Sequence, residues 1–168
     1  ECWKLNPKII SGDSLRMNKT NYFKLGIRTD NIRKSLLPYT ILTVILSLGL
    51  ITSLRLFSQS MMGVYHTLYP LFWISIPLSI LQEIVFRGFG MYQLKKLFKK
   101  PIVVILLNSF LFSLFHMFVP EQLLFAPLSF SAGLAFATVY YYHPNLFLVS
   151  LAHVVINLLP VFYWGLIG

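Results

Sequence analysis

The chain has 168 residues, of which 57% are hydrophobic and 11% are charged, and its mean hydropathy is +0.71. Soluble domains carry about one quarter charged residues, so this composition excludes an ordinary soluble domain and favours a membrane protein. The formal net charge of +9 comes mainly from basic clusters that flank apolar segments. We therefore attribute the charge to orientation in a membrane and predict no nucleic-acid partner.

A basic N-terminal segment precedes five apolar segments, each close to the length of about 20 residues that a membrane-spanning helix needs. The N-terminal segment, residues 1–35, holds eight of the fourteen Lys and Arg residues. The sequence predicts an all-α, multi-pass transmembrane helical bundle with about five spanning helices, in one domain over residues 36–168. The predicted spans cover residues 36–57, 68–92, 102–119, 123–142 and 146–167.

Lys and Arg residues are distributed asymmetrically between the predicted loops. The loop predicted at 93–101 contains KKLFKK and falls on the same side as the N-terminal segment if five spans alternate. The links at 58–66 and 120–122 fall on the opposite side and contain neither Lys nor Arg. Because positively charged loops stay in the cytoplasm, we predict a multi-pass protein of the cell membrane with a cytoplasmic N-terminus.

The second predicted span contains two charged residues, Glu83 and Arg87. A charged side chain at the centre of a membrane helix costs about 2.5–3.5 kcal/mol, so neither residue is expected to face lipid. Four residues apart on a helix, the two side chains share a face and can pair. One interpretation is a structural ion pair that locks the helices together, and the other is a functional site within the membrane.

Two later spans repeat this four-residue spacing. The third contains Phe112 and His116, with Asn108 one turn earlier on the same stripe, and the fifth contains His153 and Asn157. A lone His in an apolar helix is more often a core residue than a catalyst. Three helices that each direct polar residues along one stripe instead favour a common pocket with a carboxylate, a guanidinium, two imidazoles and an amide.

Such a set of side chains suits hydrolysis. A carboxylate and an imidazole can hold and deprotonate a water molecule, while a second imidazole and an amide can donate hydrogen bonds to an oxyanion developing on a scissile carbonyl. The alternative is a zinc site with Glu83, His116 and His153 as ligands. The chain lacks the HExxH spacing, so we expect hydrolysis without a metal cofactor.

In order and spacing, these residues resemble the motifs of the CAAX-protease and bacteriocin-processing (CPBP, or Abi) family of intramembrane endopeptidases. That family carries Glu-Glu-x-x-x-Arg on one helix, Phe-x-x-x-His on a later one and His-x-x-x-Asn on a third. This chain reads QEIVFR at 82–87, FSLFH at 112–116 and HVVIN at 153–157. The resemblance covers about residues 70–160 and implies a helical membrane domain whose cavity opens toward the membrane and the cytoplasm.

The resemblance also implies a role for each motif residue. The family's first Glu and His116 activate a water molecule, while His153 and Asn157 stabilise the oxyanion. Glu83 and Arg87 take the positions of the family's second Glu and its Arg. The implied substrate is a peptide or a lipidated protein near the cytoplasmic face of the lipid bilayer.

The chain departs from the family pattern at Gln82, which stands where the family has its first Glu. An amide does not accept a proton at neutral pH, and Glu83 does not simply replace it, because one residue rotates a side chain by about 100° around an α-helix. Three explanations stand: an engineered Glu-to-Gln exchange, a natural variant that uses Glu83, or a fold without protease activity. The third describes a non-catalytic scaffold or immunity-type protein that binds a membrane-protein partner. A transporter fragment has little support in the sequence.

Overall fold

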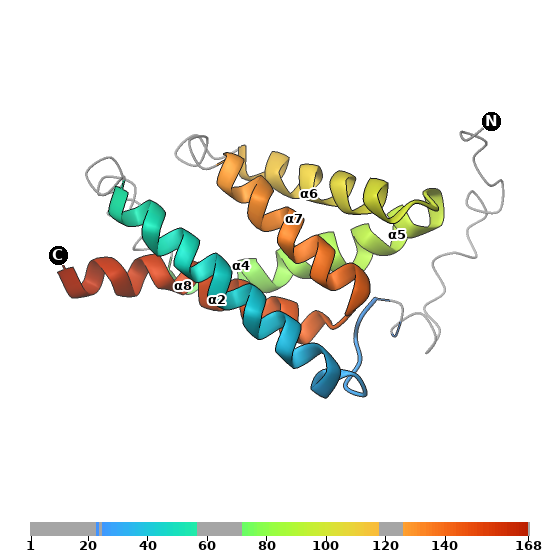
Figure 1. The fold of residues 1–168 in the computed structure, drawn as a ribbon, viewed down its shortest axis with the longest axis horizontal. Coiled ribbons are helices and arrows are strands. Elements are labelled where there is room, and N and C mark those ends of the chain that lie inside the picture. Colours follow the sequence, from blue (N-terminus) through green and yellow to red (C-terminus); the bar gives the residue numbers. More distant parts are fainter. Residues whose placement is uncertain (1–22, 24, 57–71, 118–125, 168) are drawn as a thin grey trace.

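The computed structural model describes residues 23, 25–56, 72–117 and 126–167, and all regular secondary structure in these residues is helical (Figure 1). The all-α class is therefore confirmed for this part of the chain. In chain order, the elements are α2 (Ile32–Leu56), α4 (Phe72–Glu83), the π-helix η4 (Ile84–Gly90), α5 (Met91–Leu97), α6 (Pro101–Met117), α7 (Ala126–Tyr142) and α8 (Leu146–Ile167).

The described helices follow the predicted spans, with differences at their ends. Helix α2 begins at Ile32, before the predicted start of the first span, and α8 has the predicted bounds of the fifth. Parts of the other three predictions, at 68–71, 118–119 and 123–125, lie outside the described residues.

Two helical segments of the described residues are long and apolar enough, by length and composition, to cross a membrane. They are Ile32–Leu56, which is α2, and Ile74–Leu97, which runs through α4, η4 and α5. Pro101–His116 and Leu146–Pro160 are shorter apolar helices. Large apolar side chains such as Leu48 of α2 are exposed, as expected for a surface that faces lipid rather than water. The count of five spans, the bundle and the orientation of the N-terminus stay predictions.

The prediction of a basic loop at 93–101 is wrong in extent, because α5 continues to Leu97. Lys95 and Lys96 lie in the last turn of α5, where a cation is favourable at the negative end of the helix dipole. Lys95 also donates a 3.2 Å hydrogen bond to the carbonyl oxygen of Tyr141, and its Nζ lies 4.0 Å from the centroid of that ring. These contacts with the end of α7 explain why the helix extends into the basic stretch.

Helix α8 packs against both α2 and α4, and α6 packs along α7, as Figure 1 shows. Helix α8 therefore brings the third motif, at 153–157, close to the end of α4, where the first motif begins at Gln82. The packed helices enclose a core of buried apolar side chains, which includes Tyr39, Leu42, Met91, Val104, Phe136, Val149 and Ala152.

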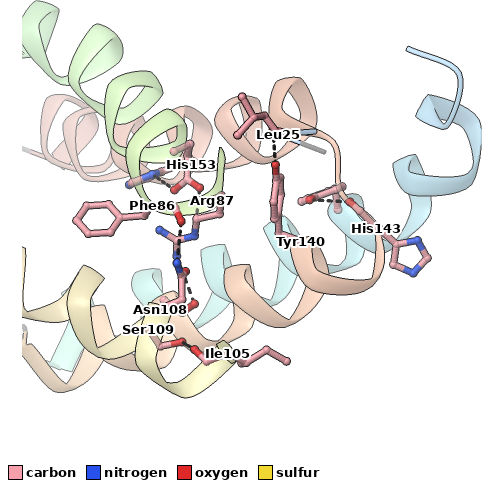
Figure 2. Close-up of polar contacts among 12 residues, drawn as sticks. Leu25, Phe86, Arg87, Ile105, Asn108, Ser109, Tyr140, His143 and His153 are labelled. Atoms are coloured by element: carbon pink, nitrogen blue, oxygen red, sulfur yellow. Dashed lines mark hydrogen bonds and ion pairs between the residues drawn. The ribbon is translucent and has the colours of Figure 1, made fainter. Parts of the chain in front are cut away.

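The residues before α2 are held against the turn between α7 and α8. The hydroxyl of Tyr140 donates a 2.6 Å hydrogen bond to the carbonyl oxygen of Leu25 (Figure 2). The backbone amide of Leu146 donates a 2.8 Å bond to the carbonyl oxygen of Gly26. These bonds join segments that are far apart in the sequence and position the start of α2 relative to α7 and α8.

We expect Gly26→Ala to destabilise the protein by about 1–3 kcal/mol, the usual cost of a strained backbone conformation. Gly26 has a φ of +76°, and a Cβ there would collide with the hydroxyl group of Tyr140. Gly49→Ala in α2 is the control, because no described atom lies within 4 Å of its Cβ, and Ala is favoured over Gly in a helix by about 1 kcal/mol. Unfolding free energies in one detergent should move in opposite directions, and a shared direction would contradict the prediction.

Candidate active site

Glu83 and Arg87 form a fully buried ion pair that also binds His153. Nε of Arg87, in η4, lies 3.2 Å from Oε2 of Glu83 at the end of α4. Nδ1 of His153, in α8, donates a 2.7 Å hydrogen bond to Oε1 of Glu83 (Figure 2). Each carboxylate oxygen therefore faces one basic group, and the first and third motifs meet at Glu83.

The turn that carries Arg87 is a π-helix, which the sequence analysis did not predict. In η4 the backbone amide of Met91 bonds to the carbonyl oxygen of Phe86, five residues earlier. Short π-helical turns within α-helices are frequent at functional sites. The apolar pattern of this span does not reveal such a turn, because a continuous α-helix would satisfy the same composition.

Phe112 of α6 joins the second motif to this cluster. Cζ of Arg87 lies 4.1 Å from the centroid of the Phe112 ring, a cation–π contact. The same ring centroid lies 4.5 Å from that of His116 and 5.7 Å from that of His153. The structure thus brings the three predicted motifs together, with Phe112 in contact with the guanidinium and with both imidazoles.

The backbone of its own helix determines which tautomer of His116 is present. Nδ1 of His116 lies 2.9 Å from the carbonyl oxygen of Phe112, and a carbonyl oxygen only accepts, so Nδ1 carries the proton. In the neutral ring, Nε2 therefore has a lone pair. Among the described residues, no hydrogen bond joins His116 to Glu83; the ring of Phe112 instead contacts His116 and the two partners of Glu83, Arg87 and His153.

Asn157 is held by Ser79, a residue that the sequence analysis missed. Nδ2 of Asn157 donates a 2.7 Å hydrogen bond to Oγ of Ser79, whose hydroxyl donates a 2.6 Å bond to the carbonyl oxygen of Ser75. The Ser79 hydrogen is thereby used, so Ser79 accepts from Asn157 and fixes the orientation of the amide. The position of Ser79 one turn before Glu83 is the available signal, but Ser in a helix often bonds only its own backbone.

Gln82, one residue before Glu83, is 8% exposed and lies in the last turn of α4. Within the described residues, its amide makes no hydrogen bond. Because neighbouring helical residues are rotated by about 100°, Gln82 leaves the helix on a different face from Glu83. The structure therefore gives the two residues different surroundings.

The zinc alternative has no support among the described residues. No group of three or more His, Cys, Asp or Glu residues in that part of the chain is arranged to hold a metal ion. Glu83 and His153 bind each other directly through Oε1 and Nδ1, and His116 bonds to its own helix. The three proposed ligands are thus not gathered around one point.

The fold and the cluster together define the class: a strongly apolar protein, helical throughout its described secondary structure, in which the three motifs meet around the buried Glu83–Arg87 pair. The family model for type II CAAX prenyl endopeptidase Rce1-like proteins matches residues 64–159, more than half of the chain. The chain belongs to this membrane-embedded family, and the resemblance inferred from the motifs is confirmed. Comparisons with curated proteins and with solved structures found no significant match.

Proposed function

We propose that this protein is an intramembrane endopeptidase of the CPBP type, which hydrolyses a peptide bond in a peptide or a lipidated protein. The observation that carries the proposal is the meeting of the three motifs around Glu83 and Phe112. The match to a family of CAAX prenyl endopeptidases over the same residues supports this class of reaction and a prenylated C-terminal segment as the substrate.

In this proposal His116 takes the proton of the attacking water. Its Nδ1 proton is bound by the Phe112 carbonyl, so Nε2 is the nitrogen that can accept. As the water oxygen attacks the scissile carbonyl carbon, one water proton passes to Nε2 and is later returned to the leaving amine. His116 acts here without the carboxylate that the family pattern places at position 82, because the amide of Gln82 can hold the water but cannot take a proton. We therefore expect slow hydrolysis by the chain as it stands.

Asn157 and His153 are the proposed donors to the oxyanion. Asn157 uses one N–H on Ser79, and its amide has a second. His153 donates Nδ1–H to the Glu83 carboxylate, so its Nε2 carries a proton only in the imidazolium form, whose charge Glu83 compensates. Glu83 therefore holds His153 in place in this mechanism, while Arg87 holds Glu83.

Replacing His116, His153 and Asn157 singly with Ala tests this assignment. In the Gln82→Glu background, we expect each change to lower the turnover of a prenylated peptide by about 10²–10³-fold, the usual contribution of a general base or an oxyanion donor. Ser131→Ala is the control, because this hydroxyl is exposed and donates its bond to the Pro127 carbonyl of its own helix. Unchanged cleavage by all three variants at matched expression would rule out the proposed site.

A further inference from the structure

Asn108 of α6 is a buried polar residue that belongs to none of the three motifs. Its side chain is 1% exposed, and Nδ2 donates a 2.7 Å hydrogen bond to the carbonyl oxygen of Phe86. Figure 2 shows Asn108 reaching from α6 to Phe86, next to Arg87. The bond therefore runs from one helix to the backbone of another, at the residue directly before Arg87.

The acceptor of this bond belongs to the wide turn of η4. The carbonyl oxygen of Phe86 also accepts the backbone N–H of Met91. A carbonyl oxygen has two lone pairs and can accept both bonds. Asn108 thus attaches α6 to the backbone of the π-turn, whereas the bonds within η4 do not define where that turn lies relative to α6.

Residues on two successive turns of α6 contact two successive residues of η4. Asn108 binds the backbone of Phe86, and one turn later the ring of Phe112 lies 4.1 Å from Cζ of Arg87. At Gly90, on the other side of Arg87, an added Cβ would make an ordinary contact of 3.6 Å with Nδ2 of Asn108 and would lie 3.1 Å from the carbonyl oxygen of Val85 within η4. Asn108 therefore lies close to η4 on both sides of Arg87 in the sequence.

The hydrogen bonds of the Arg87 guanidinium do not by themselves hold it in place. Nη2 donates a long bond of 3.3 Å to the carbonyl oxygen of Gly133, while Nη1 and Nε have no hydrogen-bond partner among the described residues. Nε faces Glu83 as an ion pair at 3.2 Å. The position of the guanidinium therefore depends on the Phe112 ring that it contacts and on the backbone of η4 that carries Arg87.

We propose that Asn108 is a positioning residue. By holding the Phe86 carbonyl, it fixes where the π-turn lies along α6 and how it is rotated. Arg87 is thereby placed to pair with Glu83, and Glu83 to bind His153. The consequence for turnover rests on the proposed function, whereas the consequence for the Glu83–His153 bond does not. Residues that support a reacting group in this way act through it and do not touch the substrate.

The test compares Asn108→Leu with Ser109→Ala in the full chain in detergent micelles. Ser109 is the matched control, because it is fully buried and its hydroxyl bonds to the Ile105 carbonyl of its own helix (Figure 2). Side-chain ¹⁵N NMR, with the His153 signals assigned by substitution, reports the Nδ1–H that is bound to Glu83. We expect Asn108→Leu to shift or remove this signal and Ser109→Ala to preserve it.

The second readout is turnover in the Gln82→Glu background. We expect Asn108→Leu to lower kcat about 10- to 100-fold, as small misplacements of reacting groups do, with KM unchanged. Asn108→Ala removes the amide without adding volume and is the second variant. A preserved His153 signal in a folded Asn108 variant overturns the proposal, as does a changed signal with an unchanged kcat.

Two further outcomes are also decisive. If both Asn108 variants fail to fold while Ser109→Ala folds, Asn108 serves stability alone and the positioning role is overturned. If the Gln82→Glu parent shows no turnover, the proposed function fails, and the His153 signal still decides whether Asn108 positions the cluster.

Discussion

Gln82→Glu is expected to raise peptidase turnover by about 10²–10⁴-fold, the usual contribution of a general base. The two oxygens of the neighbouring carboxylate, Glu83, face Arg87 and His153, so Glu83 is poorly placed to accept a proton from water. A carboxylate at position 82 instead supplies the base that the family pattern places there. The measurement is the initial rate of cleavage of a prenylated C-terminal peptide by the purified protein.

Gln93→Glu is the matched control for Gln82→Glu. It makes the same chemical change in α5, after the π-turn, and should leave the rate unchanged. If Gln82→Glu has little effect and Glu83→Gln abolishes turnover, Glu83 is the base and the proposed division of roles is wrong. If no variant hydrolyses a peptide, a non-catalytic scaffold replaces the catalytic proposal, and a partner that co-purifies with the His116→Ala protein would support it.

Breaking the Glu83–Arg87 pair from one side is expected to destabilise the protein by about 3–5 kcal/mol, because both side chains are fully buried and the remaining charge loses its partner. Glu83→Gln should cost more than Arg87→Met. After Glu83→Gln, Arg87 keeps its long bond to the Gly133 carbonyl and its aromatic contacts but has no charged partner among the described residues. After Arg87→Met, Glu83 keeps its hydrogen bond from Nδ1 of His153.

The double variant Glu83→Gln/Arg87→Met should cost less than the sum of the two single changes, because it leaves no unpaired charge. Reversible unfolding in mixed detergent micelles gives the three free energies. Asp30→Asn, which breaks the exposed Arg28–Asp30 pair, is the control and should have little effect. Additive effects of the buried changes would show that the two side chains do not stabilise each other.

Local patterns in the sequence predicted the helices and the pairs within them. Long apolar runs predicted the positions of α2 and α8, and a four-residue spacing predicted that Glu83 pairs with Arg87. These predictions succeed because the rise and rotation of an α-helix are the same in every sequence. The order and spacing of three such pairs also sufficed to identify the family.

The contacts between helices were decided by the tertiary structure. The bond between Glu83 and His153 joins residues 70 positions apart, and the contacts of Asn157 with Ser79 and of Asn108 with Phe86 likewise cross between helices. The spacing along one helix determines which residues share a face. It does not determine how far a neighbouring helix is rotated or shifted along its axis, because that depends on how the side chains of both helices interlock. For the same reason, the sequence predicted that Glu83 pairs with Arg87, and only the packing of α8 against α4 brought His153 to the same carboxylate.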